Sequence, residues 1–572
     1  MCHNENNNNK NNELYRKISI YEDALEEHPE KIEIFSIKET FSDTKIALHH
    51  FMNNKFELAE KKLVKFSDKT IYHSMGLSSI LFIKAIMTCE RRDLEIASES
   101  CKKTLIVIEN FRPKNKSLNF FSWIGNQQRL LSDEEIHAEL CYAETLMIKA
   151  ILTFFIDETL TSFFKGVLKI NNCHSIFRNC YKIINEEEWK NRDILIREQF
   201  EAGTRAGIGM FNLIISIMPP KIYKLLEFCG FNGNKTFGME ELLKASEMTK
   251  TLRQPLVCIY LLSWHLIGTF ILENGNTDIK LCEKLLKPLL HDYPDGAIIL
   301  FLKGRYYLIC GDIDNAIHFY NRSIKVQNTY KQFHHICYWE LIFAFAYLRQ
   351  WSRAAHNTKI LMDESKWSKC VYTYLMAILI NADKMVKKKK ETVDILLIKV
   401  SKLRLRIAGK SIPVEKFCEK KAQRYLKTGS LLLAQYEFLY FWHSFNILSS
   451  NNKLIKPILE DIMELSGDIS QNDKVDIDDK CLYYFLFGVC NRILKNYNEA
   501  EKAFYFILSK ESELTDHIYL APNATYELAL LKKSVGNIEI CKQLLKKALL
   551  YRGYLLETRL HLKIHNLAGR IE

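Results

Sequence analysis

The chain has 572 residues, of which 48% are hydrophobic and only ten are proline, so it can bury a large core and is not disordered throughout. Its formal net charge of +12 is a small excess of 80 basic over 68 acidic residues. Because the basic residues do not cluster with interleaved aromatics, the composition argues against a nucleic-acid-binding protein. Few segments alternate polar and apolar residues as strands do, and we expect an all-α fold.

The first residues are rich in asparagine, and we predict a disordered tail over residues 1–12 because it has little apolar surface to bury. This start lacks the apolar run of a signal segment, and the 16 cysteines include no Cys-x-x-Cys pair. We therefore expect reduced cysteines and a cytoplasmic protein, with nuclear location and peripheral membrane association as alternatives. Cys101, Cys310 and Cys541 are expected to act as small hydrophobic residues on helices.

A recurring spacing of small and apolar residues follows the tail. Weaker copies begin at Ala47, Ala85 and Ile342. The clearest copies are Gly304, Gly311, Ala316, Tyr320, Ser323; Gly488, Lys495, Ala500, Phe504, Ile507; and Ala529, Gly536, Cys541, Leu545, Ala548. This spacing is typical of the tetratricopeptide repeat, a helix-turn-helix unit of about 34 residues. Since one unit cannot bury its own apolar face, the copies must stack, and we predict a tetratricopeptide-type helical-repeat solenoid, an α-α superhelix.

Patterning along the chain predicts where helices and linkers lie. Ser42 and Asp43 resemble a helix N-terminus, a long helix begins near Glu134, and another covers Val414 to Lys427. Polar linkers are expected after Pro113 and from Asn451 to Asp478. The predicted regions are an N-terminal helical region with degenerate repeats (13–275), central tetratricopeptide repeats (276–383), a charged loop with connecting helices (384–477) and C-terminal tetratricopeptide repeats (478–572).

Glycines at 203, 207 and 209 could in principle cradle a phosphate. No strand is predicted before them and no Gly-Lys-Ser/Thr follows them, so close packing of helices through glycine is the better interpretation. His334, His335 and Cys337 lack a second cluster to complete a metal site, and we interpret the histidines as structural. No hydrolase or nucleotide motif is present, so we expect no enzyme, no cofactor and no metal.

Two features could contact a membrane. Leu256 to Leu272 is the longest apolar stretch, although Ser263, Trp264 and His265 interrupt it, and a helix buried inside a large helical protein explains it better than a membrane span. Lys387 to Lys390 is the densest basic run. A solvated loop is the simplest interpretation of this run, and an acidic partner or a membrane surface is the alternative.

Several ordered segments resemble the tetratricopeptide repeat protein 39 family. They are Gln327 to Leu341 (Gln-Asn-Thr-Tyr-Lys-Gln-Phe-His-His-Ile-Cys-Tyr-Trp-Glu-Leu), Glu139 to Glu144, Gly203 to Leu213, Gly230 to Gly238, Trp367 to Lys369, Gly409 to Phe417 and Arg559 to His565. The resemblance covers nearly all of the chain after its tail. It implies a helical-repeat protein without known catalytic residues, related to the fungal inclusion body clearance proteins.

We therefore predict a non-enzymatic adaptor or scaffold that binds one or more proteins. The alternative is a membrane- or lipid-body-associated protein with a role in aggregate clearance or lipid homeostasis. Arg305, Glu340 and Arg492 are the candidate partner-groove residues, because the first helix of each repeat lines the concave side of a stack. A carboxylate such as Glu340 either lines that groove or pairs with a base such as Arg305 between repeats.

Overall fold

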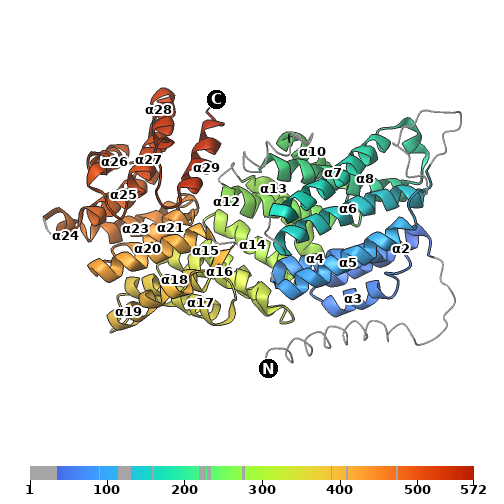
Figure 1. The fold of residues 1–572 in the computed structure, drawn as a ribbon, viewed down its shortest axis with the longest axis horizontal. Coiled ribbons are helices and arrows are strands. Elements are labelled where there is room, and N and C mark those ends of the chain that lie inside the picture. Colours follow the sequence, from blue (N-terminus) through green and yellow to red (C-terminus); the bar gives the residue numbers. More distant parts are fainter. Residues whose placement is uncertain are drawn as a thin grey trace. The chain divides into compact units, whose positions relative to one another are not determined.

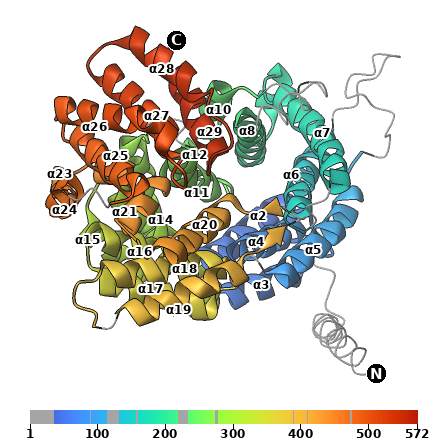
Figure 2. The same cartoon turned by 60° about the vertical axis from the view of Figure 1, so that its left-hand side comes forward.

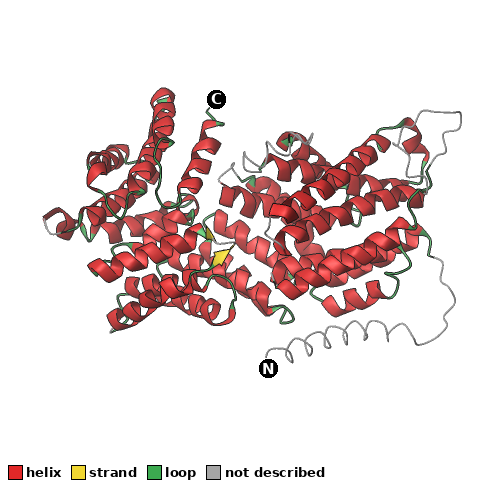
Figure 3. Ribbon diagram, in the orientation of Figure 1, coloured by secondary structure: helices red, strands yellow, loops and turns green. Residues whose placement is uncertain are grey.

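The computed structural model describes residues 35–571, apart from residues 89, 114–130, 157–159, 218–226, 228–232, 273–276, 388, 408–409 and 472–474. The described residues are mostly helical, and β1 (Arg406–Ile407) pairs antiparallel with β2 (Lys410–Ser411) in a short ladder (Figure 3). The predicted all-α fold is confirmed. The predicted tail, residues 1–12, lies outside the described residues, as does the expected linker after Pro113.

The chain forms two compact units, which divide between Tyr260 and Leu261. Unit 1 contains paired antiparallel helices (Figure 1). Its helices are α2 (Ile37–Met52), α3 (Phe56–Val64), α4 (Ile71–Thr88), α5 (Arg91–Glu109), α6 (Asp133–Ile156), α7 (Leu160–Ile183), α8 (Ile194–Ser216), α10 (Lys235–Glu247) and the first part of α11 (Gln254–Ser263), with a 3₁₀ turn at Glu187–Asn191.

Unit 2 begins within α11 and continues through a π-helical turn, Trp264–Gly268. Its helices are α12 (Thr269–Leu272), α13 (Ile279–Asp292), α14 (Ala297–Ile309), α15 (Ile313–Lys325), α16 (Lys331–Tyr347), α17 (Trp351–Glu364), α18 (Lys369–Ala382), α19 (Lys389–Val400), α20 (Pro413–Thr428), α21 (Ala434–Phe441), α22 (Ser444–Leu448), α23 (Asn452–Met463), α24 (Ser466–Gln471), α25 (Ile477–Ile493), α26 (Tyr497–Ser509), α27 (Leu520–Ser534), α28 (Ile538–Ala548) and α29 (Glu557–Ala568). Short 3₁₀ turns lie at Ser401–Leu403 and Glu511–Glu513.

The repeat spacing predicted from the sequence coincides with helix pairs in both units. Within each pair, the small residues lie where the two helices cross. Gly304 of α14, for example, leaves room for the ring of Tyr320 on α15, and a Cβ at Gly304 would lie 2.6 Å from that ring. Gly488 makes the same approach to Phe504, at 2.7 Å. These close crossings explain why the spacing recurs, because a larger side chain would hold the two helices apart.

The second position of the spacing has a different role. Gly311 and Gly536 adopt left-handed backbone angles after the first helix of their repeats, with φ of 76° and 81°. Asn54, Arg349 and Lys495 stand at the same position, and they are left-handed too, with φ of 62°, 57° and 67°. A left-handed residue ends a helix and turns the chain, so this position sets the turn between the paired helices.

The glycine run in unit 1 packs helices, as predicted. A Cβ at Gly207 would lie 2.1 Å from the ring of Phe177 on α7. Gly209 of α8 and Gly238 of α10 face each other, because a Cβ on either would lie within 2.9 Å of the other's carbonyl oxygen. These glycines let the α8 and α10 backbones touch, so the run is a packing feature.

Three local predictions were wrong. Ser42 lies inside α2, which begins at Ile37 behind a capping box formed by Ser36 and Glu39. The expected linker from Asn451 to Asp478 contains α23, whose Leu454, Ile455, Ile458 and Ile462 are buried, and α24. Its apolar residues recur three and four apart, a signal that its polar content had hidden. Cys310 is exposed and lies at the C-terminal cap of α14 instead of on a packed face.

Among the described residues, two helices are long and apolar enough to cross a membrane, namely Ile71–Thr88 and Gln254–Leu272. Only part of each is buried, 44% and 50% of the residues in the window. In the second, Cys258, Leu261, Leu262 and Leu266 are fully buried, whereas Ile271 is exposed. Burial of this kind is common for a core helix of a helical protein, and length and composition alone do not indicate a span.

Candidate functional site

Arg305, predicted to line a groove, is a buried side chain of α14. Its Nη1 donates to Glu340 Oε2 of α16 at 2.7 Å, and its Nη2 donates to the carbonyl oxygen of Leu266 at 2.8 Å. The guanidinium also lies over the ring of Phe270, 4.9 Å from its centre. Burial acts to lower the pKa of Arg305, but the carboxylate of Glu340 outweighs it and the pKa is raised. Arg305 and Glu340 therefore form one buried ion pair between neighbouring repeats.

The π-helical turn explains the contact between Arg305 and the carbonyl oxygen of Leu266. Leu266 lies in that turn, where the regular i to i+4 pattern of hydrogen bonds is interrupted. Its carbonyl oxygen accepts from both Nη2 and Nε of Arg305, the latter at 3.3 Å. The apolar stretch in the sequence is interrupted at Ser263, Trp264 and His265. This interruption lies at the start of the π-helical turn, whose Leu266 carbonyl oxygen accepts the hydrogen bonds of Arg305.

Arg492, the third predicted residue, makes a similar pair in the C-terminal repeats. Its Nε donates to Glu527 Oε2 at 2.6 Å, and Glu527 Oε1 accepts from the hydroxyl of Tyr440 at 2.8 Å. Burial opposes the charge of Arg492, yet Glu527 raises its pKa. Each pair joins residues 35 positions apart, close to the repeat length. The ion pairs thus link the first helices of successive repeats, α14 with α16 and α25 with α27.

The C-terminal helix α29 contacts the same region. Arg559 Nε donates to His443 Nε2 at 2.8 Å, and the Arg559 guanidinium lies over the ring of Trp442. Lys563 lies over the rings of Tyr440 and Tyr526, at 5.2 and 5.9 Å. The side-chain amide of Asn566 donates to the carbonyl oxygen of Leu272 at 2.6 Å. Figure 1 and Figure 2 both draw α29 near α27 and α12, in agreement with these contacts.

We call the residues around the two ion pairs, together with the groups that α29 contacts, the inner face. The name reflects that α14, α16, α25 and α27 are the first helices of their repeats. The His443 ring, 6.0 Å from that of Phe270, connects the Arg305 pair to α29. Tyr440 connects the Arg492 pair to α29. The inner face comprises Phe270, Arg305, Trp339, Glu340, Tyr440, Trp442, His443, Arg492, Tyr526 and Glu527.

Two tryptophans give the inner face its aromatic character. The rings of Trp339 and Trp442 pack edge to face with centroids 5.0 Å apart, and Trp442 also stacks on Phe343 at 5.8 Å. Both tryptophans are only half-buried, whereas Phe343 is in the core. Half-buried tryptophans beside charged groups are typical of residues that carry protein-binding energy.

A second buried polar cluster was missed by sequence reasoning. Lys421 Nζ lies 2.8 Å from Glu437 Oε2 and donates to His517 Nε2 at 2.7 Å, while Asp478 accepts from the backbone N–H of His517 at 2.7 Å. Burial lowers the pKa of Lys421 despite Glu437, and burial holds the pKa of His517 well below its usual range. These residues come from distant segments, which no spacing connects. The cluster anchors the segment before α27.

The two histidines that were weighed as metal ligands contact separate partners. His334 Nε2 lies 2.6 Å from the carbonyl oxygen of Gln327, and His335 Nε2 lies 3.4 Å from Glu364 Oε2. Within the described part of the chain, no group of three or more His, Cys, Asp and Glu side chains is arranged to hold a metal. His334 therefore satisfies a local backbone carbonyl, and His335 contacts the helix that follows.

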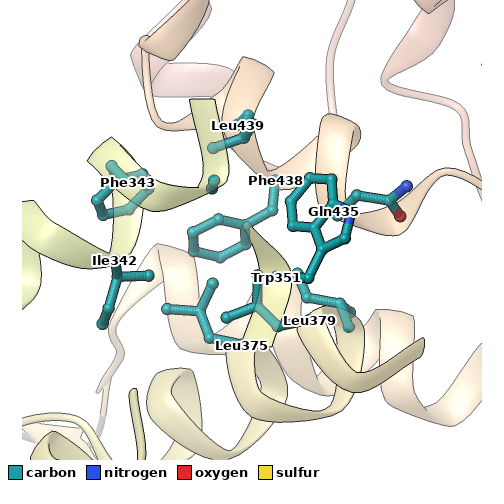
Figure 4. Close-up of a pocket in the computed structure, with 10 residues that line it drawn as sticks. Ile342, Phe343, Trp351, Leu375, Leu379, Gln435, Phe438 and Leu439 are labelled. Atoms are coloured by element: carbon teal, nitrogen blue, oxygen red, sulfur yellow. The ribbon is translucent and has the colours of Figure 1, made fainter. Parts of the chain in front are cut away.

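Cavities add little to this picture. An enclosed apolar pocket of about 10 Å³ lies among α16, α17, α18 and α21, and Figure 4 shows Ile342, Trp351, Leu375 and Phe438 around it. A space that admits about one water molecule and offers few polar partners stays dry. In unit 1, a shallow surface hollow of about 370 Å³ is lined by Phe35, Lys38, Glu39, Ser42, Asp43, Ile46 and Leu195. The larger hollow is open, and neither site resembles a catalytic pocket.

Comparison with known proteins agrees with this architecture. Residues 45–494 match the family model Iml2/Tetratricopeptide repeat protein 39. The chain is also 46% identical over 560 residues to the tetratricopeptide repeat protein ttc-39B of Caenorhabditis elegans, an alignment that covers 97% of this chain and 96% of the worm protein. The family match alone spans most of the chain, and it includes the helix pairs α14–α15 and α16–α17, which carry Arg305 and Glu340. The chain belongs to the Iml2/tetratricopeptide repeat protein 39 family.

Proposed function

We propose that this protein is a non-enzymatic adaptor or scaffold that binds another protein on the inner face of unit 2. The observation that carries the proposal is the combination of half-buried Trp339 and Trp442 with the ion pairs of Arg305 and Arg492. Stacked repeats offer an extended surface, and tryptophan and arginine are the residues that most often dominate binding energy at interfaces.

The test compares two tryptophans in the full-length protein. Trp442→Ala removes a ring of the inner face, and Trp367→Ala removes a ring that is 67% exposed elsewhere in unit 2. Proteins captured with a tagged chain in cells are quantified for each variant, and thermal denaturation checks that both variants fold. We expect Trp442→Ala to reduce the amount of captured partner at least about tenfold, because removing a hot-spot side chain weakens binding by about 2 kcal/mol or more. Equal capture by both variants would contradict the proposal.

The three residues predicted from the sequence need a separate test, because each lies in a buried pair. An ion pair that only joins repeats stabilises the fold, whereas an ion pair that a bound partner contacts also contributes to binding. If Arg305→Ala and Glu340→Ala lower the melting temperature and leave the captured partners unchanged, these two residues are structural. Loss of partner from a folded variant would assign them to the binding face.

We also propose a cytoplasmic location. The free thiols of buried Cys101 and Cys541 support it, because structural disulfides are rare in a reducing compartment. Fractionation of cells that express the full chain tests this location. Recovery with the nuclei or with washed membranes would count against it.

A further inference from the structure

We propose that the inner face of unit 2 binds a basic amphipathic helix, and that α29 occupies this site as an exchangeable internal ligand. The inference rests on the proposed function, because it names the chemistry of the partner that the inner face takes. A partner helix with the pattern of α29 would compete with α29 for the same aromatic and polar groups.

The pattern is a stripe of cations and apolar side chains on one side of α29. Leu560, Ile564 and Leu567 are buried, and Arg559 and Lys563 precede the first two of them directly. Residues that are three or four apart share a helix face, so the five side chains form one continuous docking stripe. The opposite side carries Thr558, Leu562 and His565, which are exposed.

The inner face supplies groups that match this stripe. Trp442 presents its ring to the Arg559 guanidinium, and Tyr440 and Tyr526 present theirs to the Lys563 ammonium. His443 offers Nε2 as a hydrogen-bond acceptor. Aromatic rings bind cations through their negative faces, and this attraction selects for positive charge at two positions of the bound helix.

The connection to the repeats allows α29 to leave. Residues 549–556 join α28 to α29 and include two left-handed residues, Gly553 at φ 78° and Leu556 at φ 62°. Leucine is strained at such an angle, and the strain is relieved when α29 is released. The helix has only 12 residues, so it is not stable when isolated in water and takes its order from the face it contacts. Its tether gives it a high effective concentration, which a free helix must overcome.

The experiment measures whether the site accepts α29 in trans. A fluorescent peptide of residues 555–571 is titrated with three full-length proteins, namely the wild type, the doubly substituted Arg559→Glu/Lys563→Glu and the matched control Thr558→Glu/His565→Glu. Fluorescence anisotropy reports binding. We expect the Arg559→Glu/Lys563→Glu protein to bind at least about tenfold more tightly than the wild type, because its own helix no longer competes. The control should bind like the wild type, and a peptide with both charges reversed should not bind.

The idea is overturned if the Arg559→Glu/Lys563→Glu protein binds no better than the wild type, or binds the charge-reversed peptide equally well. Should that variant not fold, hydrogen exchange on the wild type decides. Faster exchange in α29 than in α27, increased further by saturating peptide, supports the proposal, and equally slow exchange in both helices rejects it.

Partner capture separates this inference from the proposed function. Peptide binding without any cellular partner at the inner face would leave the helix site standing and refute the adaptor. Partner capture that depends on Trp442, with no peptide binding, would keep the adaptor and refute the helix site.

Discussion

Unit 1 and unit 2 each bury an arginine against a glutamate, and they use the pair differently. In unit 1, Arg253 makes two hydrogen bonds to Glu144, at 2.6 and 2.7 Å, and two more to the Tyr72 hydroxyl and the Gln199 carbonyl, both at 3.3 Å. All of these partners lie inside the unit. A charge enclosed in this way stabilises one arrangement of helices and is not available to a ligand.

In unit 2, the corresponding charges lie at repeat intervals, and their contacts include Phe270 and Lys563, which are partly open to solvent. Arg305 reaches His443 through Phe270, and Glu527 reaches Lys563 through Tyr440. In both units the buried ion pair packs helices together, and in unit 2 it also lies against the residues that we propose as a binding face.

The largest effect is expected in unit 1. Glu144→Ala leaves the guanidinium of Arg253 buried without its carboxylate, which should reduce the free energy of unfolding by about 3–5 kcal/mol. Chemical denaturation of the full chain, followed by helical circular dichroism, measures it. The double substitution Arg253→Met/Glu144→Leu removes both charges and should cost clearly less. An equal loss of unfolding free energy in the single and double variants would show that the unpaired charge of Arg253 does not cause the destabilisation.

A smaller effect is expected from the helix crossings that both units share. Ala316→Leu in unit 2 and Ala97→Leu in unit 1 enlarge fully buried residues at the same repeat position. Each should destabilise the protein by about 1–3 kcal/mol through overpacking. His318→Leu, on the exposed side of the same helix as Ala316, serves as the control. An unchanged denaturation midpoint in either alanine variant would contradict the repeat register.

Acid should weaken unit 1 through His137. Burial lowers the pKa of His137 to about 3, below its usual 6.5, while the Tyr72 hydroxyl lies 2.6 Å from its Nδ1. As the pH falls, His137 therefore takes up a proton in the unfolded chain before it does so in the folded protein. The contribution of neutral His137 to the free energy of unfolding is present above pH 6.5 and is lost as the pH falls below it. Between pH 7.5 and 5.5 the loss from this group is about 1.4 kcal/mol. Denaturation at both pH values should show a smaller loss in His137→Asn than in the wild type.

The smallest effect concerns the repeat turns, and it is stabilising. Lys495 is left-handed at φ 67°, where a residue with a Cβ is strained and glycine is not. Lys495→Gly should increase the stability of unit 2 by about 0.5–1 kcal/mol. Lys495→Ala keeps the Cβ and should bring no such gain. A loss of stability in the glycine variant would mean that contacts of the Lys495 side chain stabilise unit 2 by more than the backbone strain at this residue destabilises it.

Local spacing was enough to predict the helix pairs, because a close crossing admits only small residues at fixed steps along the chain. Ala316, Ala500 and Cys541 were located in this way, and so was the glycine packing of α8. The long helix from Asp133 and the helix from Pro413 were likewise visible as apolar residues three and four apart. In each case the signal lies within about one repeat, the range over which a single pattern constrains the backbone.

Side-chain partners between distant segments could not be read from the chain. For Glu340 the sequence left two alternatives open, a groove position or a pair with Arg305, and the structure has the pair. The pairs of Lys421 with His517 and of Arg559 with His443, 96 and 116 positions apart, were not predicted. No periodicity encodes such contacts, because they depend on how the repeats stack and on where α29 folds back. The sequence therefore sufficed for the repeats and their helices, whose constraints are local. The inner face and its occupant emerged only from packing, since burial decides which charges must find a partner.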